Sequence, residues 1–252
     1  MFPILFDLAG HPVPTYAVAV LIGAVVALLI RRAEVRRLGY ATTPGHGWVS
    51  VGALVGAVIG AKLGMALFEP VASLPALAMR ALSLDFTGKT VIGGLAGGYL
   101  GVEGMKRLVG VKHSTGDAFA VALPVALAFG RIGCLMAGCC WGTETTLPWA
   151  VHLHGGARHP TQPLEAIGLL VIAAWLWRIR RRARPDGHLF RRFLVAYAVL
   201  RFAMQALRGD PVLHWGPLDA VQWVCLATAV LFSWLIWRGE RDQSARARAA
   251  LI

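Results

Sequence analysis

Seven long apolar stretches, separated by short charged or glycine-rich segments, limit most strongly how this chain can fold. A helix needs about 20 apolar residues to cross the hydrocarbon core of a bilayer. Seven such helices and their connections use up the 252 residues. The sequence therefore predicts an all-α, polytopic membrane protein with seven transmembrane helices, in which residues 1–252 form a single integral membrane domain. The stretches cover 13–30, 48–68, 91–102, 118–137, 163–177, 193–207 and 218–237.

The composition excludes the main alternatives to a membrane protein. Hydrophobic residues make up 57% of the chain and charged residues only 15%, whereas soluble domains carry about 25% charged residues. A cytosolic enzyme, a coiled coil and a disordered chain are therefore excluded. Four cysteines are too few for a secreted disulfide scaffold of this length.

The basic residues predict the orientation of the chain. Of the 25 lysines and arginines, 18 follow the first, third, fifth and seventh stretches, and four lie in the alternate connections. Because basic residues gather in cytoplasmic loops, the N-terminus is expected outside and the C-terminus in the cytoplasm. The net charge of +12 is explained by these loops, so we expect no nucleic-acid partner.

Three basic residues, Lys62, Arg131 and Arg201, fall inside or at the ends of apolar stretches. A charge there costs several kcal/mol unless it reaches water, pairs with an acid or binds an anion. Two interpretations stay open, namely structural ion pairs and a site for an anionic group such as a lipid phosphate.

The connections on the outer side, 69–90 and 138–162, are expected to form a small extracytoplasmic cap.

Residues 130–142 read GRIGCLMAGCCWG and resemble the signature of the prolipoprotein diacylglyceryl transferase family, roughly G-R-I-G-N-F-I-N-G-E-x-W-G. Further segments resemble family motifs in the family's order, and Tyr16 falls where the family carries a tyrosine. These segments are GAKLG at 60–64, IGGLAG at 92–97, TLPWAV at 146–151, HPTQPLE at 159–165, RFAMQ at 201–205 and LDAVQ at 218–222. The resemblance implies a seven-span transferase of the bacterial inner membrane that moves diacylglyceryl from phosphatidylglycerol to the lipobox cysteine of a preprolipoprotein.

The resemblance and the residue chemistry together suggest a site. Arginine binds phosphate through a planar, permanently charged fork, so Arg131 and Arg201 are expected to lie together near the outer leaflet and hold the lipid headgroup. Cys134, Cys139 and His159 complete the candidate catalytic set. We expect no cofactor and assign no metal. The candidate substrate-binding residues are Tyr16, Lys62, Gly93, Gly94, Gly142, Gln162, Glu165, Gln205 and Arg208.

The chain also departs from the family pattern. Ile92 stands where the family has a histidine, and Cys134 and Ala137 stand where it has asparagines. Cys139 and Gln205 replace glutamates. Three functions stay open: the family reaction, a thiol-dependent lipid or acyl transferase on the same scaffold, and a non-catalytic lipid-binding membrane protein.

The cluster of Cys134, Cys139 and Cys140 permits three interpretations. The cysteines are small fillers or a disulfide, or one of them is a thiolate activated by Arg131, or they join a histidine in a metal site. The candidate histidines are His152, His154 and His159, one of which could also accept the substrate's thiol proton. Gly93 and Gly94 suit close helix packing as well as approach to a lipid headgroup.

Overall fold

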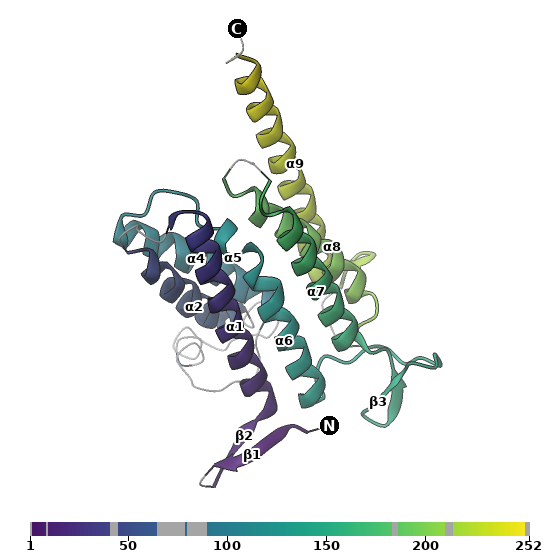
Figure 1. Ribbon diagram of the computed structural model, residues 1–252. Helices are drawn as coiled ribbons and strands as arrows, with labels where there is room; N and C mark the ends of the chain where they lie inside the picture. Colours follow the sequence, from purple (N-terminus) through teal and green to yellow (C-terminus); the bar gives the residue numbers. More distant parts are fainter. Residues whose placement is uncertain are drawn as a thin grey trace. The chain divides into compact units, whose positions relative to one another are not determined.

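The computed structural model describes residues 2–8, 10–40, 45–64, 79, 90–182, 186–209 and 214–249. These residues are mostly helical, and each predicted apolar stretch overlaps a helix (Figure 1). The fourth stretch is covered by two consecutive helices. The helices are α1 (Thr15–Arg37), α2 (His46–Leu63), α4 (Val91–Val109), α5 (Asp117–Ala120), α6 (Ala122–Ala137), α7 (Thr161–Ile179), α8 (His188–Gln205) and α9 (Ala220–Ala249).

Among the residues that the structure describes, four helical segments are long and apolar enough to cross a membrane. They are His46–Leu63, Asp117–Ala137, Thr161–Ile179 and Ala220–Ser244. Helices α1, α4 and α8 match the remaining three predicted stretches by position. The mostly helical architecture is thus confirmed, whereas the crossing of the membrane by all seven helices and the orientation of the termini stay predictions.

The described part of the chain also contains three short antiparallel hairpins, which the all-α prediction omitted. Strand β1 (Ile4–Leu8) pairs with β2 (His11–Pro14), β3 (Val151–Leu153) with β4 (Gly156–Arg158), and β5 (His214–Trp215) with β6 (Leu218–Asp219). Each hairpin contains only two strands, and hairpins of this size are marginal without further packing. They therefore decorate a helical protein and do not change its class.

The chain divides into two compact units, Met1–Glu34 with Ser114–Ile252 (the main unit) and Val35–His113 (the second unit). In the second unit, α2 and α4 pack through two facing rows of glycines. A Cβ atom on Gly97 would lie 2.3 Å from the carbonyl oxygen of Gly56, and one on Gly93 would lie 2.3 Å from that of Gly60. The backbones therefore touch in the manner of small-residue membrane packing, which confirms a packing role for Gly93.

In the main unit, α7 is covered on two sides, by α6 and by α8, and α8 packs on α9. Fully buried apolar side chains such as Leu169, Leu176 and Phe193 form the core between these helices. The N-terminus of α8 is capped from another helix, since the carboxylate of Asp117 accepts hydrogen bonds from the backbone N–H groups of Gly187 and Phe190, both at 2.9 Å. The C-terminal part of α9 extends beyond its neighbours (Figure 1).

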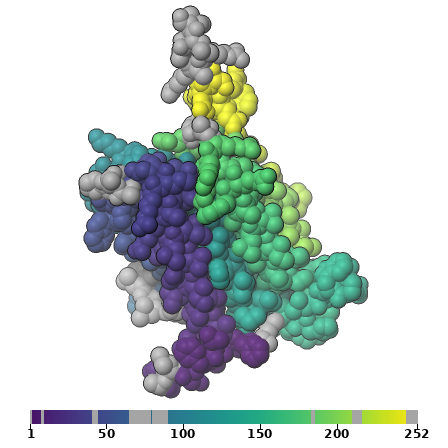
Figure 2. Space-filling model, in the orientation of Figure 1, coloured from purple at the N-terminus to yellow at the C-terminus, as the bar shows by residue number. Residues whose placement is uncertain are grey.

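The first predicted cap segment, 69–90, lies outside the described residues except for positions 79 and 90. The second segment, 138–162, is described and contains the β3–β4 hairpin. In the space-filling view this hairpin is a lobe that projects from the helices of the main unit (Figure 2). Segment 138–162 begins at Gly138, the residue that follows the last residue of α6. Its φ of 72° lies in the left-handed region, which favours glycine.

Candidate active site

Three helices of the main unit bring Arg131, Glu165 and Arg201 together in the protein interior. Nη2 of Arg131 on α6 lies 2.8 Å from Oε1 of Glu165 on α7. Nη1 of Arg201 on α8 lies 3.7 Å from the other carboxylate oxygen of Glu165. The two predicted phosphate-binding arginines are therefore joined by one carboxylate. Glu165, one of the candidate substrate-binding residues, therefore faces both arginines.

This cluster carries more positive charge than its single carboxylate can neutralise. The side chains of Arg131 and Arg201 are 8% and 11% exposed and that of Glu165 is 2% exposed, so water screens them little. Nη1 of Arg201 and Oε1 of Gln205, one helical turn further on α8, have no hydrogen-bond partner among the described residues. A buried polar group without a partner is costly, and an anion with acceptor oxygens would satisfy the guanidinium group.

The loop after α6 is fastened to the start of α7 by two side chains. Nε2 of Gln162 donates to the carbonyl oxygen of Cys139 at 2.8 Å, and Oγ1 of Thr161 donates to that of Cys140 at 2.9 Å. Gln162 is one of the predicted site residues, and it is buried. Its role in the structure is to hold the backbone of the cysteine segment close to Glu165.

Gly142 lies where this loop passes between two other segments. The N–H of Thr143 donates to the carbonyl oxygen of Leu207 at 2.9 Å, and that of His159 donates to the carbonyl oxygen of Thr143 at 3.0 Å. Gly142 also forms an antiparallel bridge with Arg208. A Cβ atom at position 142 would lie only 2.5 Å from the carbonyl oxygen of His159. Only glycine allows this close approach.

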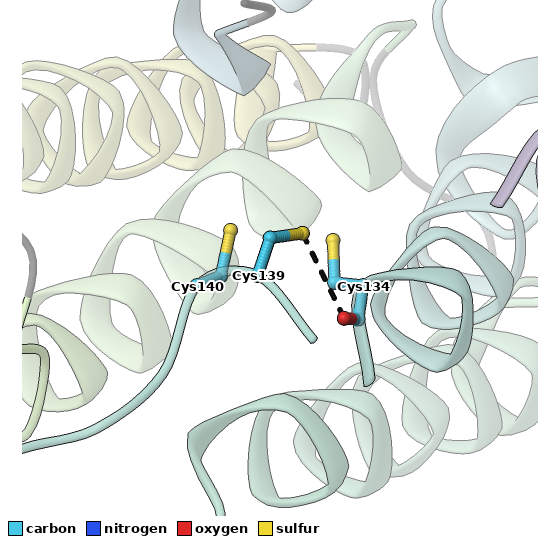
Figure 3. A group of neighbouring side chains, drawn as sticks. All are labelled: Cys134, Cys139 and Cys140. Carbon is cyan, nitrogen blue, oxygen red and sulfur yellow. Dashed lines mark hydrogen bonds between the residues drawn. The ribbon is translucent and has the colours of Figure 1, made fainter. Parts of the chain in front are cut away.

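The three neighbouring cysteines converge beside the end of α6. The sulfur atoms of Cys134, Cys139 and Cys140 all lie within 4.8 Å of one another, and none forms a disulfide. Figure 3 shows the sulfur of Cys139 directed toward Cys134, with which it also makes a 3.7 Å contact at the carbonyl oxygen. Cys134 is buried, whereas Cys139 and Cys140 are half-buried. The fourth cysteine, Cys225, is buried on α9.

The surroundings shift the pKa values of the two loop thiols, Cys139 and Cys140, in opposite directions. Hydrogen bonds from Cys134 and Cys139 lower the pKa of Cys140, and the positive charges of Arg208 and Arg131 act in the same direction against the effect of burial. For Cys139, the hydrogen bond with Cys134 lowers the pKa, but the hydrogen bond with Cys140 and burial outweigh it and raise the pKa overall. Cys140 is therefore the loop thiol with the stronger thiolate character.

The histidines of the cap occupy different environments. His154 hydrogen-bonds the carbonyl oxygen of Gly138 at 2.8 Å, and its ring lies 4.3 Å from the ring of Trp141. His152 is exposed on β3, and His159 is half-buried beside Thr161. A surface concavity of about 630 Å³ lies over the same hairpin, and its lining residues include neither Arg131 nor Arg201.

The remaining predicted residues fall into two groups. Tyr16 on α1 belongs to the main unit and interacts electrostatically with the cysteine cluster and with Arg131. Lys62 on α2, Gly93 and Gly94 on α4 belong to the second unit, as does Ile92. Lys62 is buried. Participation of this second group in the site stays a prediction.

Comparison with known proteins identifies the family of this chain. Residues 3–238 match the model of the family described as prolipoprotein diacylglyceryl transferase. The chain belongs to the prolipoprotein diacylglyceryl transferase family. Relatives named phosphatidylglycerol–prolipoprotein diacylglyceryl transferase include one from Nitratidesulfovibrio vulgaris, 34% identical over 79% of this chain and 82% of its own length. One from Solidesulfovibrio magneticus is 32% identical over 96% of both chains, and one from Rhizobium meliloti is 29% identical over 98% of this chain and 94% of its own.

The sequence analysis of this prolipoprotein diacylglyceryl transferase family member did not select two residues that lie near the site. Tyr197 is buried on α8 one turn before Arg201 and interacts electrostatically with Arg131 and Glu165. Its four-residue spacing from Arg201 places both on one helix face and could have revealed it. Arg158 on β4 contacts the carbonyl oxygen of Gly142 at 3.4 Å and Glu144 at 3.3 Å. No local pattern indicates these contacts, because they depend on how the hairpin folds back.

Proposed function

We propose that this chain transfers the diacylglyceryl group of phosphatidylglycerol to the thiol of a lipobox cysteine in a prolipoprotein. The observation that carries the proposal is the buried cluster of Arg131, Arg201 and Glu165, which holds two positive charges and one negative charge. A phosphodiester headgroup carries one negative charge and several acceptor oxygens. It would therefore balance the charge of the cluster and satisfy Nη1 of Arg201.

The reaction forms one bond and breaks one. The acceptor sulfur attacks the glyceryl carbon that carries the phosphate oxygen, so that a C–S thioether bond forms as the C–O bond breaks. The electron pair of that C–O bond leaves with glycerol phosphate, whose phosphate gains negative charge during the step. A well-placed donor can stabilise such developing charge by about 3–4 kcal/mol. Arg131 and Arg201 are the donors in this proposal.

The thiol proton of the acceptor must also be removed. His159 is our candidate for this role, because it is half-buried and adjoins Thr161 and Gln162, which hold the cysteine segment. Imidazole has a pKa close to neutrality and is well suited to accept a proton from a thiol. Ile92 cannot perform this function, since its side chain has no titratable group.

The lipid substrate fits a location in the inner membrane, with the site at its outer side. Four helical segments are apolar and long enough to cross the bilayer, and the distribution of basic residues supports an external N-terminus. In this proposal all seven helices cross the membrane, the acyl chains of the lipid enter laterally between them, and segment 138–162 receives the acceptor peptide.

The proposal is tested with the purified full chain in lipid nanodiscs. A synthetic lipobox peptide is supplied with phosphatidylglycerol, or with phosphatidylcholine as a matched lipid, and the product is analysed by mass spectrometry. We expect a thioether-linked diacylglyceryl peptide and release of glycerol phosphate with phosphatidylglycerol alone. Binding of phosphatidylglycerol without any product would contradict the proposal and favour a lipid-binding protein.

A second candidate function follows from the convergence of three thiols beside Arg131. In a thiol-dependent acyl transferase, one thiol of the cluster, with Cys140 favoured by its thiolate character, would attack the acyl carbonyl carbon of a lipid, release the lipid alcohol and form a thioester that then reacts with an acceptor. The discriminating measurement is a search for a hydroxylamine-sensitive acyl group on the enzyme. A labelled acyl-enzyme that is lost in Cys134→Ser, Cys139→Ser or Cys140→Ser would support this second function.

A further inference from the structure

The cysteine cluster has a geometry that neither the charge of the arginines nor the proposed transfer explains. Its three sulfur atoms lie within 4.8 Å of one another although Cys134 belongs to α6 and the other two cysteines follow the helix end. Among the described residues, no histidine, aspartate or glutamate side chain joins this group. The donor set therefore consists of sulfur alone.

The backbone is arranged so that these sulfur atoms converge. Gly138 ends α6 in a left-handed conformation, and the N–H of Cys139 returns to the carbonyl oxygen of Cys134 at 3.1 Å. Cys140 then adopts a φ of 62°, which is unusual for a residue with a side chain. Such strain persists where the surroundings hold it, and here Gln162 and Thr161 bind the carbonyl oxygens of Cys139 and Cys140.

The chemistry of three thiols selects a particular kind of ligand. Thiolate sulfur is a soft donor that favours Cu(I) and Zn(II) over hard cations. Structural Zn(II) sites take four ligands in a tetrahedron, whereas Cu(I) forms stable complexes with only two or three sulfur atoms. A donor set of three sulfurs without a fourth protein ligand therefore matches Cu(I) better.

The surrounding charge supports the same assignment. Three thiolates around one monovalent cation leave two negative charges, which are costly at a half-buried position unless they are compensated. Arg131 and Arg208 both interact electrostatically with the cysteine cluster. Their positive charges would compensate the complex. Cys139 and Cys140 are half-buried, so the cluster is not fully enclosed by protein.

We propose that Cys134, Cys139 and Cys140 form a three-sulfur binding site for a soft monovalent metal ion of the Cu(I) type. Each thiol that binds the ion releases its proton to solvent, and the oxidation state of the metal does not change. The proposal does not depend on the proposed lipid transfer, although Arg131 lies beside both sites, and occupancy of the sulfur site is measured without any assay of activity.

The test uses the purified full chain under anaerobic, reducing conditions. Cu(I) is added and the protein competes with a coloured Cu(I) chelator, while X-ray absorption reports how many sulfur atoms surround the metal. We expect one Cu(I) per chain with three sulfur neighbours. Replacing a ligand, as in Cys139→Ser or Cys140→Ser, is expected to weaken Cu(I) binding by more than the roughly 10–100-fold that loss of an outer-shell partner typically costs. The matched control is Cys225→Ser, which removes a buried cysteine outside the cluster and leaves binding unchanged.

Several outcomes would overturn the proposal. One is Cu(I) binding that persists in a variant lacking all three cysteines. Another is a disulfide within the cluster when the protein is isolated with its thiols blocked, and a third is tighter binding of Zn(II) than of Cu(I). Because Cys134→Ser alters a buried helix position, its thermal unfolding is compared with that of the unaltered chain. The X-ray absorption of the unaltered chain tests the site even if that variant fails to fold.

Discussion

Nη2 of Arg131 lies 2.8 Å from Oε1 of Glu165, and this buried ion pair joins α6 to α7. The second oxygen of Glu165 faces Arg201 on α8, so one carboxylate connects three helices at the centre of the candidate active site. In the proposed function, two guanidinium groups fixed in this way would receive a phosphate with little rearrangement. The site is thus held by the same contacts that pack the helices.

Arg131→Ala is expected to reduce transfer to the lipobox peptide by about 100-fold or more, because it removes a charged donor from the developing phosphate charge. Arg131→Lys keeps the charge but loses the planar fork, so it should restore only part of the activity. The rate of peptide lipidation measures both effects. Arg32→Ala serves as the control because Arg32 is an exposed arginine on α1. Unchanged rates in both Arg131→Ala and Arg201→Ala would refute the proposed headgroup site.

Glu165→Gln is expected to destabilise the protein, since it leaves two buried guanidinium groups without their shared counterion. Removing one partner of a buried ion pair typically costs about 3–5 kcal/mol. The midpoint of thermal unfolding in detergent should fall accordingly. Glu240→Gln is the matched control, because the Glu240 side chain that pairs with Arg192 is 52% exposed. Equal effects of the two substitutions would show that burial of Glu165 does not matter.

Gly97→Ala is expected to separate α2 from α4. The added Cβ would lie 2.3 Å from the carbonyl oxygen of Gly56 and 2.6 Å from the Cα atom of Gly60, and overpacking of this kind typically costs about 1–3 kcal/mol. Gly104→Ala, on the same helix, adds its Cβ where no atom lies within 4 Å. We expect thermal unfolding to occur at a lower temperature in the first variant only. A stable Gly97→Ala variant would mean that the two glycine rows are not in contact.

Gly142→Ala is expected to abolish transfer because its Cβ would meet the carbonyl oxygen of His159 at 2.5 Å. Relief of that clash requires a shift of the loop that connects the cysteine cluster to Arg208. Gly130→Ala on α6 is the control, as its Cβ would have no neighbour within 4 Å. Lipidation rates and thermal unfolding are measured for both. Full activity of Gly142→Ala would show that the loop tolerates the shift and that its position does not govern the reaction.

The apolar stretches and the motifs were sufficient to predict the helices and the candidate site residues. The period and length of an apolar run are local properties, so each predicted stretch corresponds to a helix. The same reasoning missed the three hairpins, since strands of only two to five residues are too short to show a clear periodicity. It also assigned Gly93 two possible roles, and the 2.3 Å approach to Gly60 shows that packing is one of them.

Sequence by itself determined that the chain is helical and apolar, that three basic residues fall within its apolar stretches, and that three cysteines lie within seven positions. Only the tertiary structure decided that Glu165 is shared by two arginines from different helices, and that the three sulfur atoms converge. The reason is physical: hydrophobic periodicity acts over a few residues along one helix. Distances between side chains on separate helices depend instead on how those helices pack and how the loop after Gly138 turns.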